Sequence, residues 1–150
     1  MRESLERAWT SRTIHPAFAD QYRAGKPIGQ CGVSSVWLAR RLRSDFNVEG
    51  TYCYGDLSFD DARIGSVRRH CWIEIGDLAQ ADRLVIDLTA DQASGFGERV
   101  IVFSMHDLRA RGIYYDGRIR KGLDELPADA VWPRFLILSD IVDNSEEAAA

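Results

Sequence analysis

RHCWIEIGDLAQADRLVIDLT, residues 69–89, contains two runs of β-branched and aromatic residues on either side of a turn, a pattern typical of strands. The runs span 69–75 and 83–88, and the connection is short enough for a hairpin, so we expect antiparallel neighbours. In that pairing the start of the first strand lies beside the end of the second. His70 and Asp87 are therefore predicted to lie at the same end of the hairpin.

Asp87 is the carboxylate that we expect to orient His70. Its neighbours Ile86 and Leu88 are apolar, so its strand should be at least half buried, and a buried carboxylate needs a partner. An imidazolium provides one. Glu74 points to the same face of its strand as His70 but lies further along it, and we rank it below Asp87.

A cysteine stands at the predicted start of a helix. Gly29–Gly32, with the sequence Gly-Gln-Cys-Gly, follows a loop over 25–29. From Val33 onward apolar residues recur at spacings of three and four, which predicts an amphipathic helix that ends near 44–46. In the first turn, unpaired backbone N–H groups and the helix dipole favour a thiolate. Most free cysteines are small buried apolar residues, but the flexible, polar neighbours of Cys31 favour a nucleophile.

Cys31, His70 and Asp87 together predict a nucleophile, a general base and an orienting carboxylate. Cys53 and Cys71 alternate with apolar or aromatic residues in strand patterns, and we interpret both as core thiols. The sequence therefore predicts one reactive thiol among three.

The two other histidines are interpreted as structural. His15 precedes a proline at a turn. His106 lies in the first turn of a short helix, for which Ser104 is the predicted N-cap and Asp107 its capping-box partner. Neither histidine has a strand carboxylate beside it, so His70 is the predicted base.

The remaining pattern predicts an α+β fold with N-terminal helices. Residues 3–24 are predicted to be helical in two pieces, broken near His15-Pro16, and Gly112 is predicted to end the short helix. Further strands are predicted over 50–54, 99–103 and 132–138. We expect the helix that carries the cysteine to pack on an antiparallel sheet.

Composition indicates an ordinary globular chain. Of its 150 residues, 45% are hydrophobic and 28% charged, which predicts one domain over residues 1–142. Residues 143–150 are predicted to be a flexible tail that frays or extends a last helix. The longest apolar runs fall far short of the roughly 20 residues that span a membrane, and the charged N-terminus is unlike a signal peptide. We therefore expect no membrane association.

The net charge and the number of cysteines indicate which binding partners and which cellular compartment to expect. A net charge of −4 gives no basis for nucleic-acid binding, and the basic clusters at 68–69 and 118–121 are interpreted as solvated surface or substrate-side charge. Three cysteines without a Cys-x-x-Cys pair indicate neither a disulfide framework nor a zinc site. We expect no metal or other cofactor and a reducing, cytoplasmic location.

Three blocks of the chain resemble the active-site blocks of the transglutaminase-like superfamily, in a small bacterial-type single-domain form. In that family they read Gly-Gln-Cys-Trp-Val, His-x-Trp-x-Glu and Asp-x-Thr-Pro-Gln, in this order. Here they read Gly29-Gln30-Cys31-Gly32-Val33, His70-Cys71-Trp72-Ile73-Glu74 and Asp87-Leu88-Thr89-Ala90-Asp91-Gln92. The resemblance extends over residues 29–92 and implies a papain-like fold.

The resemblance also implies roles for individual residues. Cys31 would be the nucleophile that forms a thioester, His70 the general base and acid, and Asp87 the orienter. The backbone N–H of Cys31 would hold the oxyanion together with Gln30 as a second donor. The further oxyanion or substrate candidates are Gly32, Trp72 and Gln92.

Departures from the family pattern change some of these implications. Gly32 stands where the family has a tryptophan, which opens the site, and Trp9 is the candidate for an upstream oxyanion tryptophan. No Asp-x-Asp-x-Asp-Gly loop is present, so calcium dependence is not implied. The implied substrate is a peptide or protein amide. Peptidase, deamidase and transglutaminase activities share this chemistry, and we favour hydrolysis.

Two other functions stay open. Gly95-Phe96-Gly97 resembles a motif of arylamine N-acetyltransferases, which use a cysteine, histidine and aspartate with acetyl-coenzyme A. The other is a non-catalytic binding module on the same fold. Such modules usually lack one or more residues of the triad, and all three residues are present here.

Overall fold

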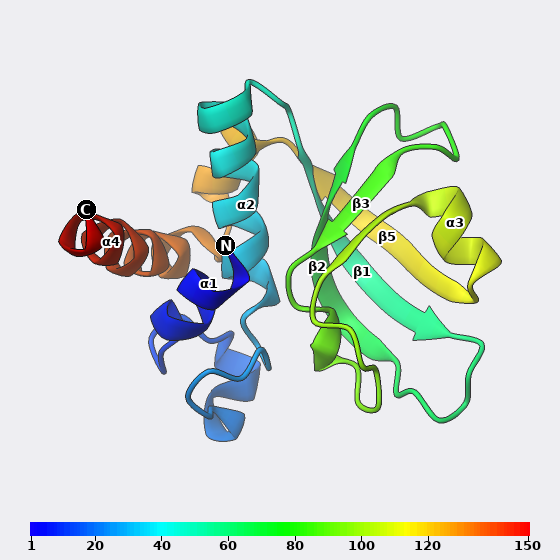
Figure 1. Ribbon diagram of the computed structural model, residues 1–150, viewed down its shortest axis with the longest axis horizontal. Helices are drawn as coiled ribbons and strands as arrows, with labels where there is room; N and C mark the ends of the chain where they lie inside the picture. Colours follow the sequence, from blue (N-terminus) through cyan, green and yellow to red (C-terminus); the bar gives the residue numbers. More distant parts are fainter.

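Five antiparallel strands form one sheet, in the order β4-β3-β2-β1-β5, in the computed structural model, which describes residues 1–150 (Figure 1). The strands are β1 (Thr51–Phe59), β2 (Val67–Ile75), β3 (Leu84–Asp87), β4 (Ile101–Ser104) and β5 (Ile113–Lys121). Strands β1, β2 and β3 each pair with the next strand in the chain, whereas β5 crosses to the edge opposite β4 and pairs with β1. This crossing brings the later part of the chain beside the first hairpin.

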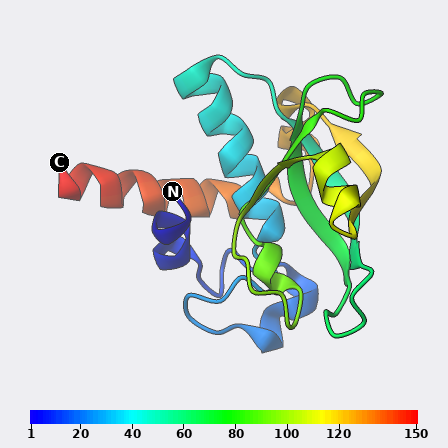
Figure 2. The same cartoon turned by 45° about the vertical axis from the view of Figure 1, so that its right-hand side comes forward.

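The helices divide between the two faces of the sheet (Figures 1 and 2). One layer consists of α1 (Arg2–Ala8), α2 (Cys31–Phe46) and α4 (Trp132–Ala149), whereas α3 (Met105–Ala110) lies on the other face. Short 3-10 helices occupy the connections: η1 (Pro16–Gln21), η2 (Ala90–Gln92) and η3 (Leu123–Ala128). Helix α2 lies between α4 and strand β2 and is the centre of the helical layer.

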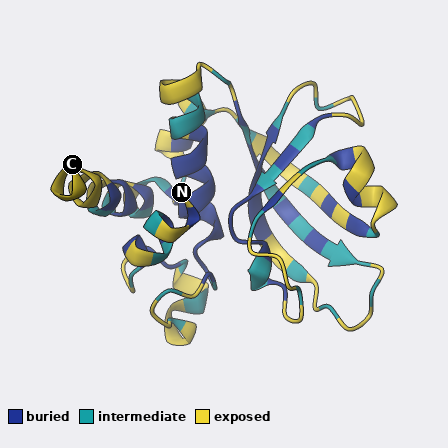
Figure 3. Ribbon diagram, in the orientation of Figure 1, coloured by how far each residue is buried: buried dark blue, intermediate teal, exposed yellow.

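Two hydrophobic cores lie on opposite faces of the sheet. The first contains Val36 of α2 and Ile73 of β2, and the second contains Trp72 of β2 and Leu108 of α3. Successive residues of β2 therefore enter different cores, as the alternation predicts. All residues of α2 from Cys31 to Ala39 are buried, and only the later turns reach solvent (Figure 3).

Most of the predicted elements are confirmed. The helix at 31–46 and the strands at 69–75, 83–88 and 99–103 are present, with boundaries within a few residues of the prediction. Pairing of β2 with β3 is antiparallel, as the hairpin prediction requires. Ser104 caps α3 by accepting a hydrogen bond from the backbone N–H of Asp107 at 3.0 Å, also as predicted.

The predicted strand at 132–138 is wrong. These residues form the first turns of α4, in which Phe135, Leu138 and Val142 are buried on one side, at spacings of three and four. Residues 143–150, predicted as a tail, continue this helix to Ala149 with their side chains exposed. A run of aromatic and branched residues favours a strand locally, but burial against α2 selects the helix.

Strand β5 was not predicted. Its burial alternates only over its first residues, Ile113–Asp116, and its later part is basic and exposed. The predicted strand at 50–54 begins correctly but continues to Phe59, because β5 and β2 pair with it on both sides.

None of the helices combines the length and hydrophobicity needed to cross a lipid bilayer.

Candidate active site

Helix α2 begins at Cys31 because the chain turns at Gly29. Gly29 has a φ of +73°, and a Cβ there would lie 2.5 Å from a side-chain carbon of Ile14, so glycine is required. Gln30 provides no side-chain cap, and Ser34 is the first residue whose N–H donates within the helix, to the Gln30 carbonyl at 3.2 Å. The three preceding N–H groups have no helical partner and favour an anion.

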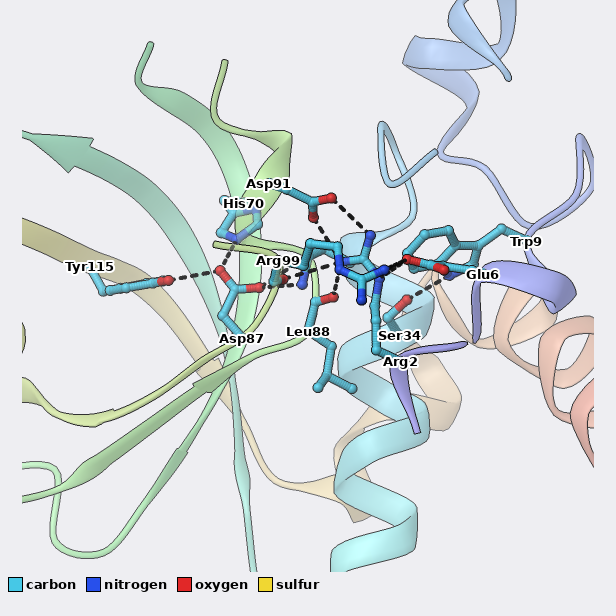
Figure 4. Close-up of polar contacts among 11 residues, drawn as sticks. Arg2, Glu6, Trp9, Ser34, His70, Asp87, Leu88, Asp91, Arg99 and Tyr115 are labelled. Atoms are coloured by element: carbon cyan, nitrogen blue, oxygen red, sulfur yellow. Dashed lines mark hydrogen bonds and ion pairs between the residues drawn. The ribbon is translucent and has the colours of Figure 1, made fainter. Parts of the chain in front are cut away.

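His70 and Asp87 form a buried pair at one end of the β2–β3 hairpin (Figure 4). Nε2 of His70 lies 2.6 Å from Oδ2 of Asp87. Tyr115 of β5 donates its hydroxyl to the same carboxylate oxygen at 2.8 Å. Thr89 donates its backbone N–H, at 2.8 Å, and its hydroxyl, at 3.2 Å, to Oδ1. Both oxygens of Asp87 are therefore satisfied, and the carboxylate fixes the orientation of the imidazole.

A β-bulge lies directly before His70. The β1–β2 register shifts there, so that two residues of β2 stand opposite one residue of β1. Arg69 is the second of the two and has a left-handed φ of +58°, which costs a non-glycine residue about 1 kcal/mol. Its carbonyl oxygen lies 3.9 Å from Sγ of Cys31. The bulge thus brings the end of β2 against the start of α2.

Cys31 and His70 have pKa values shifted in opposite directions. Hydrogen bonds from Cys71 and from His70 hold the pKa of Cys31 well below its usual value, although burial acts to raise it. Burial acts to lower the pKa of His70, but the charge of Asp87, its hydrogen bond and the neighbouring Cys31 raise it to about 10. Asp87 engages Nε2, so Nδ1, which has no hydrogen-bond partner of its own, is the ring nitrogen left to face Cys31. The pair favours a thiolate and an imidazolium.

Cys71 contributes to the site as well as to the core. Its Sγ is hydrogen-bonded to the hydroxyl of Tyr52 at 3.0 Å and lines the same cleft as Cys31. Its hydrogen bond to Cys31 raises the pKa of Cys71 well above its usual value, so Cys71 is the protonated partner of the two. Cys53 is a core thiol, as predicted, and burial raises its pKa to about 12.

A cleft of about 300 Å³ opens onto Cys31. Cys31 lines it and is 7% exposed, whereas His70 is fully buried and does not line it. Of the two groups, the sulfur therefore faces the cleft and the imidazole lies behind it. Besides its thiols and tyrosines, the lining has one imidazole and four charged side chains, those of His15, Arg69, Lys121, Asp129 and Arg134.

A second, more open hollow of about 520 Å³ adjoins the cleft. Phe18 and Arg69 line both, so they form the ridge between them. The hollow lies over residues 66–69 of β2 and its approach and over η2. An extended ligand bound at Cys31 has room to continue across this ridge.

Three of the predicted candidates lie outside the cleft. The amide of Gln30 faces the N-terminal segment, where Oε1 accepts from the hydroxyl of Thr13 at 2.8 Å and Nε2 donates to the carbonyl of Thr10 at 3.2 Å. Trp72 is buried behind the imidazole, with its ring stacked 6.2 Å from that of His70. Gln92 lines the second hollow instead.

Gly32 is the candidate that the structure brings to Cys31. It lines the cleft, and a Cβ there would lie 3.1 Å from a side-chain carbon of Val131. The glycine therefore keeps this wall of the cleft open. Trp9, in contrast, is buried and donates its indole N–H to the hydroxyl of Ser34 at 3.0 Å.

Glu74 does not contact His70, in agreement with its lower rank than Asp87 as the orienting carboxylate. Its carboxylate accepts from the indole N–H of Trp72 at 3.1 Å and from Nε of Arg83 at 3.0 Å. The exposed position of His106 also agrees with the sequence interpretation, whereas His15 both caps η1, by accepting from the N–H of Ala17, and lines the cleft.

Tyr115 and Arg134 are the site residues that sequence reasoning missed. Tyr115 lies in the strand that was not predicted, and Arg134 lies in the helix that was predicted to be a strand. Pro133, in the first turn of α4, is the signal that favours the helix. The Gly95–Gly97 segment does not line the cleft, and Phe96 packs its ring 4.8 Å from that of Phe59.

The fold and the site define an α+β protein in which a cysteine at a helix start meets a buried histidine–aspartate pair. No protein-family model, curated protein or solved structure matches the chain.

Proposed function

We propose that the protein is a cysteine-dependent acyl-transfer enzyme of transglutaminase-like type, which hydrolyses an amide bond through a Cys31 thioester. The observation that carries this proposal is a thiol that lines the cleft and has its pKa lowered partly by His70, while His70 itself is held 2.6 Å from Asp87. A buried, oriented base behind an accessible thiol is the arrangement that thiol acyl transfer requires.

In the first half of the reaction, the Cys31 thiolate attacks the amide carbonyl carbon and forms a C–S bond. The carbonyl oxygen becomes an oxyanion, and His70 donates its proton to the amide nitrogen as the C–N bond breaks. The amine or ammonia leaves, and the acyl group remains on Cys31 as a thioester.

Water resolves the thioester in the second half. His70, now neutral, takes a proton from the water as the oxygen attacks the thioester carbon. The C–S bond breaks, the carboxylic acid leaves, and the thiolate–imidazolium pair is restored. Asp87 keeps its contact with Nε2 throughout, so that Nδ1 carries the proton in both directions.

The oxyanion is expected to bind at the start of α2. The backbone N–H groups of Cys31 and Gly32 precede the first helical hydrogen bond and lie beside the reacting sulfur. Loss of one such donor typically costs about 3 kcal/mol of transition-state stabilisation. Gln30 is no longer favoured as the second donor, because its amide is engaged by Thr10 and Thr13.

An activated acyl ester and a library of fluorogenic amides test the proposal. With p-nitrophenyl acetate, intact-mass analysis of the quenched protein should find one acetyl group on Cys31. Amide hydrolysis should fall on the order of 10⁴-fold in Cys31→Ala. Cys53→Ala is the matched control, because it removes a buried thiol outside the cleft.

Two outcomes would decide against amide hydrolysis. The proposal requires that the ester acetylates the wild type and not Cys31→Ala. It also requires that the library contains an amide whose turnover depends on Cys31. A folded wild type that takes no acetyl group and turns over no amide faster than Cys31→Ala would be a binding module. An acetylated Cys31 that transfers only to added arylamines would favour the acetyltransferase function instead.

A further inference from the structure

Some of the charged side chains that line the cleft form ion pairs, and others do not. Lys121 and Asp129 form an ion pair with each other. Arg69 and Arg134 line the same cleft and pair with no carboxylate. The cleft beside Cys31 therefore carries two cations that form no ion pair, although Asp129 acts on Arg134 at longer range.

Arg134 is the more constrained of the two cations. It lies in the first turn of α4 and is half-buried, and its one hydrogen bond runs from Nη1 to the backbone carbonyl of Thr13 at 3.2 Å. Burial lowers the pKa of Arg134 from its usual value, since the charged form is partly desolvated, but a guanidinium remains a cation near neutral pH. A half-buried guanidinium with free N–H donors and no anionic partner is the kind of group that binds a carboxylate.

The rest of the lining limits what can carry that carboxylate. Phe18, Ile119 and Val131 contribute apolar side chains, and the cleft has the volume for a small ligand only. Arg134 and Cys31 line this one space, so a group that reaches both is short.

We propose that the cleft selects an acyl donor whose acyl part bears a carboxylate on a short hydrocarbon chain, as an acidic amino-acid side chain does, with Arg134 as the residue that binds it. The proposal rests on the proposed function, because the acyl group must be delivered to Cys31. Arg69, which is exposed at the rim of both hollows, strengthens the positive potential at the opening.

Alkylation of Cys31 by two reagents of nearly equal size tests the selection. Iodoacetate and iodoacetamide both form a C–S bond with the thiolate and release iodide, and they differ in a carboxylate against a neutral amide. The rate constant of each is measured at the Cys31 peptide, in the folded protein and in the chain unfolded by guanidinium. The ratio of iodoacetate to iodoacetamide rates should be at least about tenfold higher in the folded protein.

Substitution of Arg134 assigns the effect to its residue. Arg134→Gln should bring the ratio to within about threefold of the unfolded chain, and Arg134→Lys should give an intermediate ratio, because it keeps the charge without the planar fork. Arg12→Gln is the matched control, since this arginine is exposed and lies outside the cleft, and its ratio should equal that of the wild type. Circular dichroism checks that each variant is folded; should Arg134→Gln not fold, Arg134→Lys carries the comparison.

The outcomes separate this inference from the proposed function. If Arg134→Gln slows both reagents by the same factor, the arginine acts only on the thiolate, and the selection for a carboxylate is wrong. Equal ratios in the folded and unfolded protein would overturn it as well, while leaving the reactive thiol intact. If neither reagent modifies Cys31 in the folded protein, the proposed function fails, and this inference fails with it.

Discussion

At the scale of single residues, the reactivity of Cys31 depends on groups from two different strands. His70 and Cys71 are consecutive in β2, and both interact with the same sulfur because the bulge at Arg69 brings this end of the strand against α2. Asp87 affects the Cys31 thiol only indirectly, through its contact with the His70 imidazole. The shifted pKa of the thiol is therefore a property of the whole cluster.

The first prediction concerns the pH dependence of alkylation at Cys31. A group whose pKa is lowered stays ionised as the pH falls below its usual value of 9.0, so the iodoacetamide rate should be almost constant from pH 9 downward until the lowered pKa is reached. In His70→Ala the thiolate loses its counter-charge, so the pKa of Cys31 rises back toward its usual value. The rate at about pH 7 should then fall at least about tenfold.

A stopped-flow or mass-spectrometric pH profile of both proteins measures this effect. His106→Ala serves as the control, because that histidine is exposed on α3 and should leave the profile unchanged. Amide turnover, where present, should also decline on the alkaline side as His70 loses its proton near its pKa of about 10. A wild-type profile with a single midpoint close to 9 would contradict the ion pair.

The second prediction separates the two neighbouring thiols. Cys71 supplies the largest of the hydrogen bonds that lower the pKa of Cys31, so Cys71→Ala should raise that pKa and slow alkylation at about pH 7 several-fold, by the roughly 1 kcal/mol typical of such a bond. Tyr52 would lose its hydrogen bond to the removed sulfur at the same time.

Cys53→Ala distinguishes this effect from a general loss of packing. It removes a thiol of the same size from the other core, where no contact with Cys31 exists. Both variants should lose similar stability in urea, whereas only Cys71→Ala should move the pH profile of Cys31. Identical profiles for the two variants would remove Cys71 from the site.

At the scale of elements, the sequence predicts those parts in which local pattern and packing agree. The β2–β3 hairpin and the start of α2 have alternation, turn residues and helix periodicity that favour one structure each, and the placement of His70 beside Asp87 follows from them. The placement of Cys31 at a helix start and of His70 beside Asp87 could therefore be predicted from short segments alone.

Elements that depend on distant partners could not be predicted in this way. Strand β5 lies at an edge of the sheet, and its second half is basic. Charged side chains are tolerated at an edge because one side of the strand faces solvent, so this half lacks the apolar alternation that predicts a strand. Residues 132–138 have a strand-like composition, and only the helical spacing of Phe135, Leu138 and Val142 against α2 identifies a helix. Tyr115 and Arg134 were missed for this reason.

The third prediction tests the helical assignment of these residues. In α4, Phe135 is 1% exposed and Leu136 is 50% exposed. Phe135→Ala should therefore destabilise the protein by about 3–5 kcal/mol, whereas Leu136→Ala should change the free energy of unfolding by less than about 0.5 kcal/mol. In a strand over 132–138, residues 136 and 138 would share one face, and Leu136→Ala would be costly. Urea unfolding of the two variants decides between the arrangements.

At the scale of the whole molecule, the site is assembled from segments that are far apart in the chain. Cys31 comes from the helical layer, His70 and Asp87 come from the sheet, and Tyr115 comes from a strand that crosses to the opposite edge. Cys31 therefore stays beside His70 and Asp87 only while the helical layer and the sheet keep their relative position. Contacts that join the two layers near Asp87 should matter for both stability and reactivity.

Arg2 makes several such contacts. This buried arginine of α1 donates from Nη1 to the carbonyl of Leu88 at 2.6 Å and to the carbonyl of Arg99 at 3.2 Å (Figure 4). Nη1 and Nη2 also reach the two carboxylate oxygens of Asp91, at 2.7 and 2.9 Å. The guanidinium further stacks on the ring of Trp9. One residue at the start of the chain thereby fixes the segment that directly follows Asp87.

The fourth prediction is that Arg2→Met destabilises the protein by about 3 kcal/mol, because it leaves Asp91 and two backbone carbonyls near α1 without their donor. Arg7→Met changes an exposed arginine of the same helix and should have an effect below about 0.5 kcal/mol. Arg2→Met should also slow alkylation of Cys31 under conditions where the variant is still folded, since the Asp87 strand end is no longer fixed against the helical layer. Urea unfolding gives the first quantity and iodoacetamide kinetics the second. A variant that loses stability but keeps the wild-type alkylation rate would mean that the β2–β3 hairpin alone orients His70 and Asp87, without help from α1.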